Sequence, residues 1–117
     1  MLRRFDFTNF AEAQDMIFII SKEKKLTYGE AIASSINKEI LNRIENEGYA
    51  AIAISLWGHA NPMRKWKVLK EPILQVELDG EKFEYITQVM KKNNLSNIQD
   101  AISYFLIFTV EALGYHI

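Results

Sequence analysis

The sequence predicts a small α+β protein made mostly of helices, with a few short strands. Its 117 residues are 49% hydrophobic, which is enough for one packed core. Apolar residues recur every three to four positions over much of the chain, as in helices, and alternate with polar ones over residues 73–78, as in a strand. The predicted helices are 9–21, 28–47, 81–92 and 98–113, and the predicted strands lie near 50–57, 64–70 and 73–78.

The first two helices are predicted from apolar spacing and from helix-end signals. Residues 9–21 carry one apolar stripe, formed by Phe10, Ala13, Met16, Ile17 and Ile20. Thr27 and Glu30 have the three-residue spacing of a capping box, which satisfies the free N–H groups at a helix start. Gly48 suits the left-handed residue that ends a helix. A single helix over 28–47 follows.

Residues 49–70 indicate a β-hairpin with a basic second strand. The stretch from Gly58 to Pro62 is turn-like and follows an apolar run. The next residues contain no acid and four cations around Trp66, namely Arg64, Lys65, Lys67 and Lys70. These cations indicate either contacts with nucleic acid, with Trp66 stacking on a base, or a solvated edge strand whose lysines prevent aggregation.

Residues 73–78 indicate a strand with one buried and one exposed face. Leu74, Val76 and Leu78 alternate with Gln75 and Glu77. The pair Asp79-Gly80 then ends the strand, and an amphipathic helix begins near residue 81. The predicted chain order in this region is therefore strand, helix, helix.

The last helix has a start signal and an unusual composition. Ser96 and Gln99 have capping-box spacing, and Asn97 would serve equally well as the cap. The helix is apolar nearly all round between residues 104 and 110. A second copy of the chain, or another segment, must therefore cover it. We expect a homodimer with a core that includes Ile102, Phe105, Leu106 and Phe108.

This order of elements resembles the ribbon-helix-helix repressors over residues 73–114. The matching positions are the alternating strand 74–78, the turn 79–81 and the junction 95–97 leading into 100–102. The resemblance implies an antiparallel two-stranded ribbon whose outward side chains enter the major groove of double-stranded DNA. It places Gln75 and Glu77 at the bases and the backbone of Ser96 and Asn97 at phosphate.

Two arrangements of residues 1–70 are open. In one, residues 4–7 and the two following helices are a degenerate first copy of the ribbon-helix-helix unit, with a strand-to-leucine spacing two residues longer than in the second copy. In the other, residues 28–47 form two helices, 28–35 and 37–47, which together with helix 9–21 and the hairpin 50–70 resemble a winged helix. Asn37 would then cap a recognition helix whose groove-facing residues are Lys38, Asn42 and Arg43. In either case residues 1–70 and 71–117 are expected to share one core.

The composition argues against several classes of protein. No cysteine is present, which excludes disulfides, thiolate metal ligands and cysteine nucleophiles. The two histidines lack zinc-site spacing and the five glycines are isolated, so we expect no metal, no cofactor and no enzyme activity. We find no signal peptide or membrane span, and expect a cytoplasmic protein without a membrane partner.

The predicted function is a non-catalytic DNA-binding transcriptional regulator. The basic residues at 64–70 and the predicted ribbon support it. In residues 71–117, however, acids outnumber bases, and the net charge of the whole chain is −1. The alternative is therefore an adaptor or inhibitor that presents the acidic residues of 77–84 to a protein partner and does not bind DNA.

Overall fold

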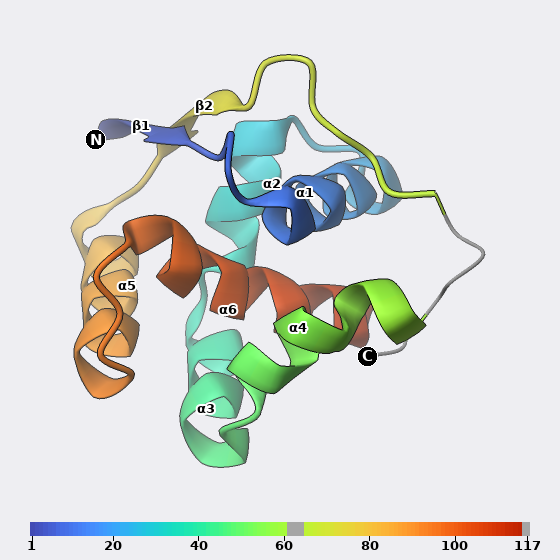
Figure 1. Cartoon of the computed structure of the whole chain (residues 1–117). Coiled ribbons are helices and arrows are strands. Elements are labelled where there is room, and N and C mark those ends of the chain that lie inside the picture. The colour runs from blue at the N-terminus through green and yellow to red at the C-terminus, as the bar shows by residue number, and fades with distance from the viewer. Residues whose placement is uncertain (61–64, 116–117) are drawn as a thin grey trace.

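The computed structural model describes residues 1–60 and 65–115, and it confirms the α+β class. Helices make up most of the chain, and the described residues contain two strands (Figure 1). The elements in chain order are β1 (Leu2–Asp6), α1 (Ala11–Lys24), α2 (Tyr28–Ser35), α3 (Lys38–Glu47), α4 (Ala50–Ala60), β2 (Ile73–Glu77), α5 (Gly80–Lys92) and α6 (Ile98–Ala112).

The two strands form an antiparallel ribbon that joins the N-terminus to the second half of the chain. Leu2 pairs with Glu77, Arg4 with Gln75, and Asp6 with Ile73. These six side chains are exposed on one face, as the alternation in 73–77 predicted for β2. Inward residues of the ribbon, Phe5, Leu74 and Val76, enter the core. The ribbon lies at one end of the molecule and α3 at the other (Figure 1).

Helix α6 lies at the centre of the fold. Every residue from 101 to 110 is buried, because α1, α2, α3, α4 and α5 of the same chain all pack against this helix. The predicted dimer-core residues Ile102, Phe105, Leu106 and Phe108 are therefore covered within one chain. A second copy is not needed to bury them, so the homodimer prediction loses the observation that motivated it.

The two halves of the chain contain strands and helices in a similar order. β1, α1 and α2 correspond in order to β2, α5 and α6. Helices α1 and α5 are each followed by a residue with positive φ, Lys25 and Asn94, and then by a leucine. The amides of Leu26 and Leu95 each donate to a carbonyl five residues earlier, at 3.0 Å. The two extra residues of the first half lie in the connection 7–10, because the second half uses only 78–79 there.

The predicted strand 50–57 is wrong, because this segment is helix α4. Ala50, Ala53 and Trp57 are buried at helical spacing, and no charged residue interrupts residues 50–60. A short apolar run of this kind fits a buried strand or a buried helix equally well.

The strand 64–70 is also absent from the described part of that range, residues 65–70, where the chain is irregular. Arg64 lies outside the described residues. The predicted winged-helix arrangement therefore lacks the strands of its wing.

The predicted single helix 28–47 is interrupted at Ile36 and Asn37. Ile36 leaves the helical conformation with φ −89° and ψ 87°, and the Asn37 side chain accepts a hydrogen bond from the amide of Ile40 to start α3. The capping role predicted for Asn37 is thus confirmed. The Thr27–Glu30 capping box is present, and Gly48 has φ 66° at the end of α3.

The predicted capping box of Ser96 and Gln99 is wrong. Asn97 occupies the cap position of α6 and makes no capping hydrogen bond with its side chain. The Gln99 side chain instead donates to the backbone oxygen of Asp6, at 3.0 Å. A tertiary contact with β1 has replaced the local bond that the spacing predicted.

Gly29→Ala should destabilise the protein by roughly 1–3 kcal/mol, because a new Cβ would overpack a fixed neighbour. That Cβ would lie 2.3 Å from the backbone oxygen of Gln75 in β2, whose position the ribbon pairing holds. Gly80→Ala, also in the first turn of a helix, is the matched control, because nothing lies within 4 Å of its Cβ. Gly80→Ala should be neutral or slightly stabilising. Urea denaturation of both variants measures the difference, and equal effects would contradict the close approach of α2 to β2.

Candidate nucleic-acid interface

The outward face of the ribbon is the first part of the candidate interface. Arg4 and Gln75 face each other across the ribbon, and both are exposed. Within the described residues, neither side chain takes part in a hydrogen bond or an ion pair. Gln75 was predicted from the alternation in β2. Arg4 was not predicted as a site residue, although one of the two arrangements for residues 1–70 counted residues 4–7 as the strand of a first copy.

The acidic side chains at the ends of this face already have partners. Asp6 accepts hydrogen bonds from the hydroxyl and the amide of Thr8, and the pKa of Asp6 is lowered by them. The Glu77 carboxylate lies 2.8 Å from the amino group of Met1. Arg4 and Gln75 therefore lie between two engaged carboxylates. The ammonium of Met1 offsets the charge of Glu77, whereas Asp6 keeps its negative charge because its hydrogen bonds come from neutral groups.

The second part is the basic segment, which we define as residues 65–72. Two adjacent buried side chains of α1 hold its backbone. Gln14 accepts a hydrogen bond from the amide of Leu69 at 3.0 Å, and Asp15 accepts one from the amide of Lys67 at 2.9 Å. Lys65, Lys67 and Lys70 remain exposed. The segment is thus irregular but anchored, and its lysines point away from the core.

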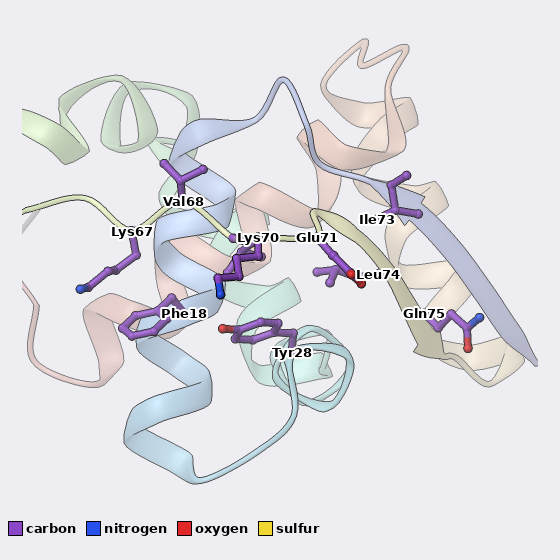
Figure 2. A pocket seen from close by; sticks show the side chains of 10 residues that line it. Phe18, Tyr28, Lys67, Val68, Lys70, Glu71, Ile73, Leu74 and Gln75 are labelled. Atoms are coloured by element: carbon purple, nitrogen blue, oxygen red, sulfur yellow. The ribbon is translucent and has the colours of Figure 1, made fainter.

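The basic segment and β2 meet at a groove of about 610 Å³. Phe18 of α1 and Tyr28 of α2 line it, together with Lys67–Glu71 and Ile73–Gln75 (Figure 2). The groove brings Lys67 and Lys70 to the same surface as Gln75. The sequence indicated the two lysines through the cluster of cations and Gln75 through the alternation in β2. Lys67 also lies over the Phe18 ring, with its Nζ 5.5 Å from the ring centroid.

Two helix starts flank the ribbon. The start of α6 reaches β1 through the bond from Gln99 to Asp6, and the start of α2 reaches β2 where Gly29 approaches Gln75. Ser96 and Asn97, the predicted phosphate contacts, precede α6 and are exposed. Amides at a helix start favour anions, so their place beside the ribbon is compatible with the predicted contact.

The residues predicted for a winged-helix interface lie elsewhere. Lys38, Asn42 and Arg43 belong to α3, at the end of the molecule opposite the ribbon (Figure 1). Lys38 and Asn42 are exposed there. They do not join the ribbon, so the structure does not bring this group together with Gln75 and Lys67.

Arg43 faces inward rather than toward a groove. It hydrogen-bonds Glu47 at 2.6 Å, forms an ion pair with Glu111, and donates to the Tyr49 hydroxyl at 3.1 Å. Its guanidinium carbon lies 4.5 Å from the centroid of the Phe108 ring. The hydrogen bond to Glu47 is the largest cause of the raised pKa of Arg43, and burial is the largest cause of the raised pKa of Tyr49. This cluster joins α3 to α6.

The acidic surface of the adaptor hypothesis is partly used within the fold. Asp79 caps α5 by accepting from the amide of Lys82, at 2.8 Å. The Lys82 ammonium donates to the carbonyls of Ala33 and Ile36, at 2.7 Å each. Glu84 is exposed. The charges of residues 77–84 thus serve helix ends as well as the surface.

Comparisons with known proteins add no assignment. No protein-family model, curated protein or solved structure matches the chain. Across residues 1–60 and 65–115, no helix has the length and apolarity to cross a membrane. The same residues contain no cluster of histidine or acidic side chains arranged to hold a metal ion.

Proposed function

We propose that this protein binds double-stranded DNA without catalysis, by placing the β1–β2 ribbon in the major groove. The observation that carries the proposal is the exposed pair of Arg4 and Gln75 at the centre of a two-stranded antiparallel ribbon. A ribbon of this kind fits the major groove, where arginine makes paired hydrogen bonds to guanine and glutamine makes them to adenine.

The similar order of elements in the two halves supports this proposal. A ribbon-helix-helix dimer obtains its two strands from two chains, whereas here β1 and β2 come from one chain. The matching turns at Lys25 and Asn94 are what a degenerate internal repeat would leave. One chain would then supply both strands of the ribbon that contacts the bases.

The lysines of the basic segment supply the electrostatic part. Lys67 and Lys70 lie on the groove beside β2, where they can approach the phosphates that flank the bases read by the ribbon. Each neutralised phosphate adds about −0.9 to the slope of log affinity against log salt concentration. Lys67 and Lys70 together would therefore give a slope of about −1.8. Because the net charge of the chain is −1, we expect modest affinity that weakens further as salt is added.

Arg4→Ala and Gln75→Ala should each weaken binding to a selected duplex by about 1–3 kcal/mol, which is roughly 5- to 150-fold. Each should also relax the preference for one base pair. Lys67→Ala with Lys70→Ala should instead weaken all duplexes equally and flatten the salt dependence. Selection from a random duplex library followed by fluorescence anisotropy at several salt concentrations measures both effects.

Lys38→Ala is the matched control, because Lys38 is an exposed lysine of α3 that belongs neither to the ribbon nor to the lining of the groove. Its affinity should equal that of the parent protein. The proposal fails if the parent protein binds no duplex at low salt, or if Lys38→Ala weakens binding as much as the ribbon variants do.

A further inference from the structure

The groove beside β2 combines apolar, aromatic and cationic groups. Leu69 and Leu74 are buried and contribute apolar lining, while Phe18 and Tyr28 add two aromatic rings from separate helices. Figure 2 shows Phe18, Tyr28 and Lys70 among the side chains that line the groove. The volume of about 610 Å³ lies within the range of small-molecule sites, about 300–1,000 Å³.

The polar groups of this groove favour an anion. Lys67 and Lys70 line it together with a single acid, Glu71. Among the described residues, neither lysine forms an ion pair and the Tyr28 hydroxyl makes no hydrogen bond. An ammonium and a hydroxyl that line one groove can both donate to the carboxylate of a bound ligand.

The cationic side of the groove is held in place before any ligand arrives. Buried Gln14 and Asp15 fix the backbone of the basic segment at Leu69 and Lys67. Folding has already ordered this backbone, so less conformational entropy is lost when a ligand binds.

We propose that this groove binds a small planar aromatic acid. The aromatic ring packs against Phe18, and the carboxylate accepts hydrogen bonds from Lys70 and the Tyr28 hydroxyl, with Lys67 adding charge. This site rests on the groove alone. Its regulatory consequence rests on the proposed function: Lys67 and Lys70 cannot neutralise a ligand carboxylate and DNA phosphates at once, so the acid should weaken DNA binding, and DNA should weaken binding of the acid to the same degree.

The direct test titrates the protein, without DNA, with 2-naphthoate and two matched probes. The neutral 2-naphthamide keeps the rings, and cyclohexanecarboxylate keeps the charge but lacks an aromatic ring. Amide chemical shifts of the basic segment and of the start of α2 report binding. We expect a Kd of about 0.1–1 mM for 2-naphthoate, a ligand of this size with ordinary efficiency. Both matched probes should bind at least about fivefold more weakly.

Two variants assign the site. Tyr28→Phe should weaken 2-naphthoate about tenfold by removing a hydrogen bond to a charged group, and Phe18→Leu should weaken it about fivefold by removing the ring contact. Lys38→Ala should leave it unchanged. Thermal melts confirm that each variant is folded. Failure of 2-naphthoate to saturate, equal binding of 2-naphthamide, or unchanged affinity in both groove variants overturns the proposal.

Measurements with duplex DNA test the groove site and the proposed function separately. Saturable 2-naphthoate binding without any duplex binding supports the groove and removes the DNA-binding proposal. Duplex binding without 2-naphthoate binding supports the DNA-binding proposal and removes the groove proposal. If both bind, 2-naphthoate should lower duplex affinity in the parent protein and do so less in Phe18→Leu, which keeps both lysines.

Discussion

Replacing Phe105 by alanine should lower the free energy of unfolding by about 3–5 kcal/mol. Phe105 is fully buried in α6, the helix that α1 to α5 surround. The neighbouring helices contact α6 from several directions, so they can close around the missing ring only in part. The loss then includes a cavity as well as the transfer of the ring. The whole free energy of unfolding of a domain of this size is about 5–15 kcal/mol.

Urea denaturation followed by circular dichroism measures this loss. Ile52→Ala is the control, because Ile52 is an apolar residue in a helix but is 63% exposed, and its replacement should stay within about 0.5 kcal/mol. Phe105→Leu should cost less than Phe105→Ala and keeps the test usable if the alanine variant does not fold. The midpoint should not depend on protein concentration, since the covering helices belong to the same chain. A loss under about 1 kcal/mol for Phe105→Ala would contradict the central position of α6.

Much of the second half of the fold could be predicted from periodicity. The strand at 73–77 and helices α5 and α6 begin and end within about two residues of their predicted bounds. In β2 and α5 the buried positions follow a single period, and Asp79 and Gly80 mark the change from strand to helix. The complete burial of residues 101–110 also follows from their composition. The segments that cover α6 could not be predicted, because a sequence pattern shows that a face is buried and not what covers it.

The first half was harder because its signals are local and ambiguous. Residues 50–57 are apolar without a clear period, and neither caps nor charges mark them as a helix. Asn37 gave a correct cap signal, but a continuous helix was expected through Ile36, since no proline or glycine interrupts it. Competition between a local cap and a longer helix depends on tertiary packing, which the sequence pattern does not contain.

The candidate site depends on pairings that are distant in the chain. Gln75 and the exposed lysines were found because exposure follows from alternation and charge. Arg4 gains its place only because β1 pairs with β2 across some seventy residues. Likewise Gln14 and Asp15 lie within a helix and give no sign in the sequence that they anchor the basic segment. A pattern of single residues cannot show such pairings.

Removal of the Asp15 carboxylate should have the second large effect. The side chain is fully buried and accepts hydrogen bonds from the Trp57 indole at 2.7 Å and from the Lys67 amide at 2.9 Å. Asp15→Ala should destabilise the protein by about 3 kcal/mol, since hydrogen bonds to a charged group contribute about 1.5–3 kcal/mol each. Alanine is also the better helix former, so this loss cannot come from helix propensity.

Glu12→Ala is the matched control in the same helix. Glu12 makes no hydrogen bond or ion pair with the described residues, and its replacement should change stability by at most about 0.5 kcal/mol. A similar loss in both variants would mean that Asp15 contributes through the general charge of α1 and not through its bonds to Trp57 and Lys67.

Hydrogen exchange and a double-mutant cycle test whether Asp15 couples α4 to the basic segment. In Asp15→Ala the Lys67 amide should exchange much faster, whereas the Leu69 amide, which Gln14 holds, should change less. Trp57→Phe removes the indole donor while keeping an aromatic ring, so its effect should be smaller in the Asp15→Ala background than in the parent protein. Because the same carboxylate positions Lys67, Asp15→Ala should also flatten the salt dependence of duplex binding, as Lys67→Ala does. Additive effects of Asp15→Ala and Trp57→Phe on stability, with unchanged exchange at Lys67, would show that the carboxylate does not connect the two segments.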